Sequence, residues 1–315
     1  MEKSKKYNFI KVVMMVLVVV AHTTRMYTPY GVVKPIYSSK ILVSITNFIY
    51  GFHMPLFIFI SGAVYCLCVK ELGKYKDTFK FIVKKFKRLM IPYFVFGIFY
   101  VTPIMIIFHF TNNNIIEYII KGILLCLNSR HLWFLYYLFI YFLIYKLIVK
   151  EKPNAVFIGS LIAISLLKIP LLSDLSLYAI YFTMGFIFND YYDIYFKSLK
   201  VNIMIICALL VIYVLSIYLN WPILVVNSVG IVTFGTLLSL FKINEKNKFY
   251  KLLLDNSMGI YLFHPMIIYI LFYYWGQYNV SPIILSLVIF IISFGISLIL
   301  TILLRKTKLK FILGE

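Results

Sequence analysis

Ten apolar stretches, most of them long enough to cross a lipid bilayer, limit the possible folds of this chain more than any other feature. A transmembrane helix takes about 20 apolar residues, and 63% of the 315 residues here are hydrophobic. No soluble domain of this length needs so much apolar surface. The sequence therefore predicts an all-α fold, a polytopic transmembrane helical bundle of about ten helices that forms a single domain over residues 1–315. The predicted spans are 9–27, 45–66, 89–109, 132–149, 154–170, 176–190, 201–219, 223–241, 257–275 and 282–304.

The placement of the basic residues predicts the orientation of these spans. A formal net charge of +20 would suit a nucleic-acid-binding protein if the charges formed one patch. With a cytosolic N-terminus, however, the segments on the cytosolic side carry 24 lysines and arginines, and those outside carry six. This asymmetry is typical of the positive-inside rule. We therefore predict a multi-pass protein of the cell membrane that contacts lipid, has both termini in the cytosol and binds no nucleic acid.

The apolar segment 115–127 tests this topology. It has about 13 residues, fewer than a helix needs to span a bilayer. Counting it as a span would turn every later segment over and reverse the charge bias. We predict a re-entrant or interfacial helix on the outer face.

Lys11 and His22 lie in the first predicted span, eleven residues apart. Because eleven residues make close to three helical turns, both side chains lie on one stripe, roughly 16 Å apart along the axis. Arg25 follows His22 by one turn, and a nearby cation disfavours protonation of the imidazole. A neutral imidazole is what a general base or an acyl acceptor requires. The alternative is a histidine that only forms a hydrogen bond to a neighbouring helix.

Further polar side chains occur in or beside the predicted spans. His53 and His264 each lie within two residues of a proline, where a kink could free backbone groups toward a cavity, although such prolines usually serve helix packing. Tyr261 shares a helical face with His264. His131 and Trp133 begin a span at the predicted outer interface. For the tryptophan, an aromatic belt is the simpler interpretation.

A basic cluster precedes the third predicted span. Lys85 and Arg88 are three residues apart and face the same way at its cytosolic end. They could bind a phosphate-bearing ligand, or they could anchor the helix to anionic lipid headgroups. The four cysteines have the spacing of neither a zinc site nor an evident disulfide framework, and we predict no metal.

Together these residues resemble the acyltransferase 3 family of integral membrane acyltransferases, particularly sugar O-acetylases of the fucose 4-O-acetylase type. The resemblance covers nearly the whole chain. Three positions depart from the family pattern. Lys11 and Lys85 stand where the family has arginine, and lysine keeps the charge but lacks the bidentate fork. Asn8 stands where the family usually has an acid near the start of the first helix. The matching segments are Asn8-x2-Lys11-x10-His22, FHMPLFIFISG at 52–62, Lys85-x2-Arg88-Leu-Met-Ile-Pro, His131-Leu-Trp133-Phe-Leu, the helix around Gly185, and Ser257-Met-Gly-Ile-Tyr261-Leu-Phe-His264-Pro265.

The resemblance implies an acyl-CoA-dependent O-acyltransferase. Members of the family move an acyl group, most often acetyl, from cytosolic acyl-CoA to a sugar hydroxyl of a cell-surface or exported polysaccharide. The expected donor is therefore acetyl-CoA on the inside, and the expected acceptor is a glycan on the outside. Whether His22 acts as a base or as a covalent acyl carrier stays open. The expected site residues are His22, His53 and His264 for catalysis, Lys11, Lys85 and Arg88 for the coenzyme, and Arg25, His131, Trp133 and Tyr261 for the substrate.

Two other classes of function remain as alternatives. A non-enzymatic translocator or exporter of a glycan or lipid-linked sugar would share the bundle and its embedded polar groups. The acidic residues all fall outside the middle of the predicted spans, which argues mildly against ion-coupled transport. A structural membrane subunit would tolerate replacement of Lys11 and His22.

Overall fold

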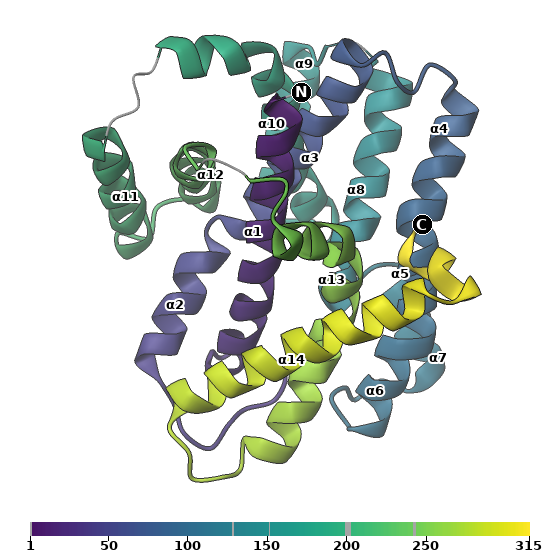
Figure 1. The fold of residues 1–315 in the computed structure, drawn as a ribbon, viewed down its shortest axis with the longest axis vertical. Coiled ribbons are helices and arrows are strands. Elements are labelled where there is room, and N and C mark those ends of the chain that lie inside the picture. The colour runs from purple at the N-terminus through teal and green to yellow at the C-terminus, as the bar shows by residue number, and fades with distance from the viewer. Residues whose placement is uncertain (1, 128, 151, 199–202, 242–243) are drawn as a thin grey trace. The chain divides into compact units, whose positions relative to one another are not determined.

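The apolar runs of the chain form helices, as the sequence predicts. The computed structural model describes residues 2–127, 129–150, 152–198, 203–241 and 244–315, and within these ranges every regular element is helical (Figure 1). A helix or a continuous helical run occupies each predicted span, although the span predicted at 201–219 begins outside the described residues. The predicted all-α class is thereby confirmed.

The helices, with π- and 3-10-helical turns labelled η, follow one another along the chain in this order: α1 (Glu2–Thr24), η1 (Arg25–Tyr27), α2 (Lys40–Tyr50), α3 (His53–Cys66), η2 (Leu67–Glu71), α4 (Thr78–Lys85), η3 (Phe86–Met90), α5 (Ile91–Phe96), η4 (Gly97–Val101), α6 (Thr102–Ile107), α7 (Ile115–Glu117), η5 (Tyr118–Leu124), η6 (Arg130–Leu132), α8 (Trp133–Ile144), η7 (Tyr145–Val149), α9 (Ala155–Leu166), α10 (Leu172–Ser198), α11 (Ile203–Tyr218), α12 (Ile223–Ser239), α13 (Lys248–Trp275), α14 (Pro282–Arg305) and η8 (Lys308–Leu313).

Several of these runs have the length and composition of transmembrane helices. Three others, α9, α11 and α12, are apolar but have only 12 to 17 residues. The segment predicted at 115–127 is helical in α7 and η5, and its re-entrant or interfacial place stays a prediction, as does the cytosolic side of both termini. In the described part of the chain, six runs are long and apolar enough to cross a bilayer: Lys3–Tyr27, Lys40–Glu71, Thr78–Ile107, Arg130–Val149, Lys248–Trp275 and Pro282–Arg305.

The chain packs as two compact units, each built from three segments. The first unit contains residues 1–14, 50–82 and 140–250, and the second contains residues 15–49, 83–139 and 251–315. The chain passes between them five times, and each passage falls inside a helix, namely α1, α2, α4, α8 and α13. No loop therefore separates the units.

In the first unit, α3 and α10 approach closely at two glycines. A Cβ atom added to Gly62 would collide with the carbonyl of Phe182, and one added to Gly185 would collide with the carbonyl of Phe59. Because helices in lipid associate by close packing rather than by hydrophobic exclusion, small residues at the contact bring the two backbones together. Gly62 and Gly185 thus form a small-residue contact between α3 and α10.

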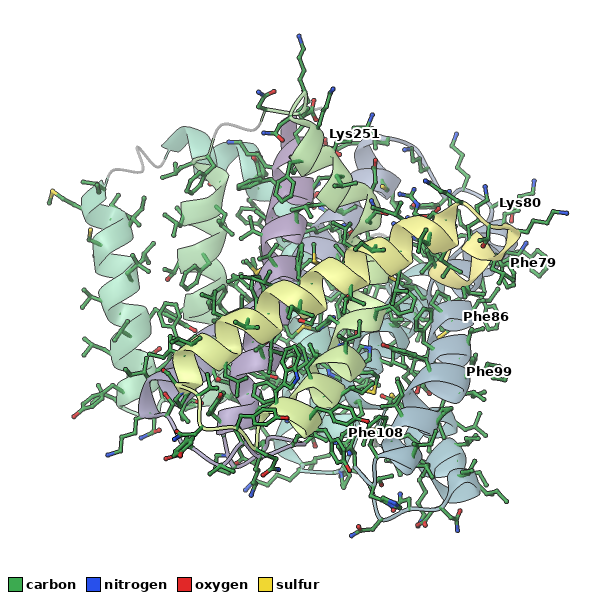
Figure 2. All side chains as sticks on the ribbon, turned by 60° about the horizontal axis from the view of Figure 1, so that its bottom comes forward. Phe79, Lys80, Phe86, Phe99, Phe108 and Lys251 are labelled. Atoms are coloured by element: carbon green, nitrogen blue, oxygen red, sulfur yellow. The ribbon has the colours of Figure 1, made fainter. Side chains whose placement is uncertain are left out.

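Two prolines that lie in the second unit shape the helical run Thr78–Ile107. Pro92 and Pro103 each follow a π-helical turn, η3 and η4 respectively. A proline lacks an N–H, and its ring collides with the carbonyl four residues earlier, so a wider turn relieves the clash. Phe86 and Phe99 project outward from this run in Figure 2 and are 43% and 76% exposed. Large exposed aromatic side chains of this kind suit contact with lipid.

Candidate functional site

Three histidines from distant parts of the sequence come together in the second unit. His22 lies near the end of α1, His131 lies in η6, and His264 lies in α13. Their ring centroids are separated by 5.0 Å for His22 and His264, 5.9 Å for His131 and His264, and 6.5 Å for His22 and His131. His131 and His264 are buried, and His22 is half-buried. The sequence predicts His22 and His264 as catalytic candidates and His131 as a substrate-binding candidate. In the structure these three residues form one histidine cluster.

The backbone of α13 around Pro265 holds two of these rings. Pro265 has no N–H to offer the carbonyl four residues earlier, so the helical hydrogen-bond ladder is interrupted here. The carbonyl four residues before Pro265 is that of Tyr261, and carbonyls on either side of it accept hydrogen bonds from side chains. The three donors are His264 Nδ1 to the Ile260 carbonyl at 2.9 Å, His131 Nε2 to the Leu262 carbonyl at 3.2 Å, and the Tyr100 hydroxyl to the Phe263 carbonyl at 2.9 Å.

These carbonyl partners decide where the lone pairs of two histidines lie. A carbonyl oxygen only accepts, so the bonded nitrogens, Nδ1 of His264 and Nε2 of His131, carry the hydrogens. In the neutral ring the lone pair then lies on His264 Nε2 and on His131 Nδ1. Both atoms are buried and lack a hydrogen-bond partner among the described residues. Leaving a buried polar atom unsatisfied costs about 1–3 kcal/mol, which favours a functional reason for the arrangement.

Of the other residues predicted for substrate contact, Tyr261 touches the cluster. Tyr261 donates its hydroxyl to the carbonyl of His131, and its ring centroid is 5.5 Å from that of His131. This bond fixes the backbone that carries His131. Trp133 opens α8 and packs its ring 5.0 Å from that of Tyr137. Arg25 opens η1, directly after α1, and is half-buried.

Two predicted site residues belong to the first unit. Lys11 lies on α1, and the unbroken helix confirms that it shares this element with His22. His53 opens α3, is 1% exposed, and lies with its ring centroid 4.8 Å from that of Tyr50. The cluster described above is contained in the second unit and does not include them.

Two of the basic residues predicted to bind the coenzyme, Lys85 and Arg88, lie at the π-helical turn η3. Lys85 ends α4 and is half-buried, whereas Arg88 lies in η3 and is exposed. The last turn of the chain packs beside them, because Leu313 is buried and Gly314 adopts φ +79° next to the backbone of Arg88. A Cβ atom on Gly314 would lie 3.0 Å from Arg88 Cα. The chain thereby supports the backbone of Arg88 and leaves its guanidinium exposed.

Sequence reasoning did not find Tyr100, whose hydroxyl binds the α13 backbone beside the cluster. It is one of 27 tyrosines, and no motif distinguishes it. Cys126 is a buried thiol that no motif marks. Its Sγ lies 3.3 Å from the Ser129 hydroxyl, and burial raises the pKa of the thiol above its ordinary value of 9.0. Within the described ranges, no group of three His, Cys, Asp or Glu side chains is arranged to hold a metal ion.

The amino-acid sequence was compared with known families, curated proteins and solved structures. A family model described as an acyltransferase domain, that of the acyltransferase 3 family, matches residues 5–304. The matched region contains the histidine cluster, Lys11, His53, and the pair of Lys85 and Arg88. No curated protein and no solved structure matches the chain.

Proposed function

The chain belongs to the acyltransferase 3 family, and from that premise we propose that it is an O-acetyltransferase of the cell membrane. In this proposal, an acetyl group moves from acetyl-CoA on the cytosolic side to a sugar hydroxyl of a cell-surface or exported polysaccharide. The histidine cluster is the observation that carries the proposal, because it presents basic ring nitrogens inside an apolar helical bundle.

The chemistry requires a group that removes the hydroxyl proton as the sugar oxygen attacks the thioester carbonyl carbon. We assign removal of the hydroxyl proton to His22. His264 Nε2 is a second proton acceptor beside it, because the ring centroids of His22 and His264 are 5.0 Å apart. As the C–O bond of the new ester forms, the C–S bond of the thioester breaks, and the leaving thiolate takes the proton back to give free coenzyme A. In a two-step variant, a ring nitrogen of His22 first accepts the acetyl group and then passes it to the sugar.

The donor's phosphates would bind at the basic residues around η3. Arg88 offers an exposed guanidinium whose planar fork suits a phosphate, and Lys85 adds a point charge one turn earlier. Lys11 is a further candidate on α1. The acceptor sugar would lie against the ring of Trp133, with Arg25 and the backbone near His131 as polar partners, because an aromatic face matches the apolar face of a sugar ring.

Transfer of radiolabelled acetyl from acetyl-CoA to envelope polysaccharide, measured with the purified protein in lipid nanodiscs, tests this function. Replacing a general base typically costs about 10²–10⁴-fold in rate, so His22→Ala and His264→Ala should each lose transfer by a factor in that range. His109→Asn is the matched control, since His109 is exposed, lies outside the cluster and has φ +53°, a conformation that asparagine accepts.

Three outcomes separate the alternatives. Undiminished transfer by His22→Ala and His264→Ala would discard the catalytic assignment. A wild-type protein that transfers no label to any acceptor would favour a translocator, which has no need of acetyl-CoA. A labelled histidine trapped in the absence of acceptor would select the two-step variant.

A further inference from the structure

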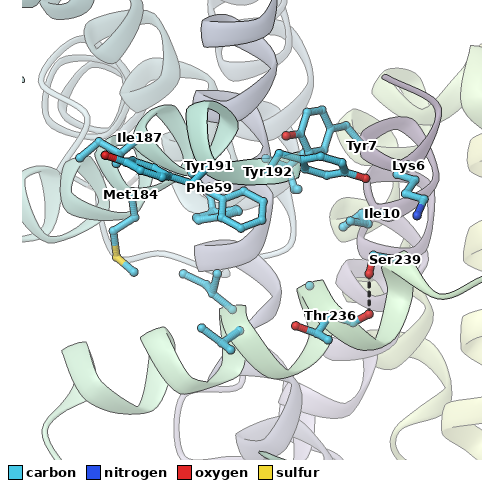
Figure 3. Close-up of a pocket in the computed structure, with 15 residues that line it drawn as sticks. Lys6, Tyr7, Ile10, Phe59, Met184, Ile187, Tyr191, Tyr192, Thr236 and Ser239 are labelled. Atoms are coloured by element: carbon cyan, nitrogen blue, oxygen red, sulfur yellow. Dashed lines mark hydrogen bonds between the residues drawn. The ribbon is translucent and has the colours of Figure 1, made fainter. Parts of the chain in front are cut away.

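The first unit contains a cavity of about 370 Å³ between α1, α3, α10 and α12 (Figure 3). Its volume lies in the range of cavities that take small organic ligands, about 300–1,000 Å³. All of its lining residues belong to the first unit, so it is separate from the histidine cluster of the second. Nothing in the proposed acetyl transfer uses it.

The cavity has an apolar interior and reaches the surface of its unit. Ile10, Ile60 and Ile231 line it and are at most 3% exposed. Tyr191 on α10 and Val232 on α12 line it as well and are 58% and 41% exposed. The cavity therefore opens between α10 and α12. In a membrane, this opening would face the surrounding lipid. An apolar cavity of this kind repels polar ligands, which would lose their hydration without gaining partners.

The lining is polarised from one end to the other. Figure 3 shows Lys6 on α1 and Ser239 on α12 at one end, and Met184 and Ile187 on α10 at the other. The polar end lies beside Tyr7, whose hydroxyl donates to Asn189 at 3.1 Å. A ligand that matches this lining has a polar group at one end and a hydrocarbon chain at the other.

Ion pairs place that polar end near the level of the lipid headgroups. Lys3 pairs with Glu71 at 2.9 Å, Lys5 with Glu245 at 2.7 Å, and Lys70 with Asp190 at 2.5 Å, all in the first unit. Charged pairs of this kind belong to the polar boundary of a membrane protein rather than to its hydrocarbon interior. Tyrosines are also enriched at that boundary, and Tyr7, Tyr191 and Tyr192 all line the cavity here. The adjoining apolar lining therefore lies at the depth of acyl chains.

We propose that this cavity is a lipid-binding site that holds one acyl chain of an anionic phospholipid, with the phosphate beside Lys6. Lysine at a helix terminus reaches toward the headgroup region while its methylene stem packs on apolar surface. Basic pockets between transmembrane helices on the cytosolic side are suited to anionic headgroups. The acyl chain of the lipid enters between α10 and α12 and extends past Phe59 toward Met184.

Gly235 offers a way to fill the cavity without disturbing its walls. A Cβ atom on this lining residue meets only Leu56 Cδ1, at 3.7 Å, which is an ordinary contact. A leucine there would occupy space that the lipid chain needs. Gly159→Leu on α9 is the matched control. A Cβ atom added to that glycine would meet no atom within 4 Å, and the residue belongs to the same unit but does not line the cavity. Val232→Trp, at the exposed mouth, blocks access by a second route.

The test is photo-crosslinking of the purified full chain in nanodiscs that contain phosphatidylglycerol with a diazirine in one acyl chain. Peptide mapping by mass spectrometry should place the label on α10 and α12, at Met184, Ile187 or Val232. Gly235→Leu and Val232→Trp should reduce this label by about tenfold, the loss expected when roughly two methylene groups leave the cavity. Gly159→Leu should label as the wild type does, and Lys6→Gln should reduce labelling to the level given by a phosphatidylcholine probe.

Several results would overturn the proposal. Labelling that is equal in the wild type and both cavity variants would show that the lipid chain lies elsewhere. Equal labelling by phosphatidylcholine and phosphatidylglycerol in the wild type would remove the role of the anionic headgroup. Stronger labelling of the same residues by a diazirine-bearing fatty acid or fatty acyl-CoA would identify a free chain or an acyl donor as the occupant in place of a phospholipid. Acetyl transfer is not measured, so failure here leaves the proposed function standing.

Discussion

Substitution of Gly185 by alanine should destabilise the first unit far more than a single methyl group usually does. The added Cβ atom would lie 2.6 Å from the carbonyl carbon of Phe59, against about 3.4 Å for an ordinary contact, so α3 and α10 must separate by at least 0.8 Å. A gap of 0.5–1 Å forfeits about a quarter to a half of the dispersion energy of each affected contact. Overpacking of this kind costs about 1–3 kcal/mol and sometimes more.

The helix propensity of alanine offsets part of this cost. Alanine is favoured over glycine in a helix by about 1 kcal/mol, so a close contact that costs about 3 kcal/mol leaves a net loss near 2 kcal/mol. For a unit of this size, that corresponds to a fall in Tm of about 4–8 °C. Gly159→Ala is the control and should have the opposite sign, because its Cβ meets no neighbour and only the gain in propensity remains.

Thermal unfolding of the detergent-solubilised protein, followed by the fluorescence of a thiol- or environment-sensitive dye, measures both variants against the wild type. A Gly185→Ala protein that unfolds at the same temperature as Gly159→Ala would refute the reasoning, since it would mean that α3 and α10 do not touch at this glycine. Gly62→Ala probes the same contact from α3 and should behave as Gly185→Ala does.

Three further predictions concern the second unit. Tyr261→Phe removes the hydroxyl that donates to the His131 carbonyl, so acetyl transfer should fall roughly tenfold, the equivalent of about 1.4 kcal/mol in the barrier, with little change in Tm; unchanged transfer would mean that this bond does not position His131. Gly314→Ala should lower Tm by a few degrees and expose the C-terminal turn to carboxypeptidase, because alanine at φ +79° is strained and its Cβ meets the backbone of Arg88. Cys126 should be alkylated slowly in the folded protein, and its rate should keep rising with pH beyond 9, because burial raises its pKa and the thiolate is the reactive form; rapid labelling at pH 7 would contradict its burial.

Local patterns were sufficient to predict the helices and one detail of the site. Whether a segment spans a membrane depends mainly on its own length and composition. The range predicted at 282–304 therefore matches α14 to within one residue, whereas α1 begins seven residues before the range predicted at 9–27. The proline beside His264 predicted a local change in the helix backbone, and Pro265 does lie inside α13 next to carbonyls that accept hydrogen bonds from side chains. These inferences needed only neighbouring residues.

Contacts between distant segments were beyond the reach of the same reasoning. His22 and His131 are 109 positions apart, and nothing in either motif states which helices bring their rings together. The sequence also predicts His53 as a catalytic candidate, and that residue lies in the first unit, outside the cluster. Gly235 likewise carries no motif, and its place in a cavity depends on four helices that meet in space. Packing of this kind is decided by shape complementarity along whole helices, which a single sequence does not display.

The three histidines of the cluster are translated at widely separated times, because they lie far apart along the chain. His264 emerges 242 residues after His22, and at about 5–20 residues per second that interval is roughly 12 to 50 seconds of translation. His131 is made 109 residues after His22, so for most of this interval the nascent chain holds one or two of the three imidazoles. The histidine cluster is therefore incomplete until α13 is translated, and truncated products that end before His264 lack it.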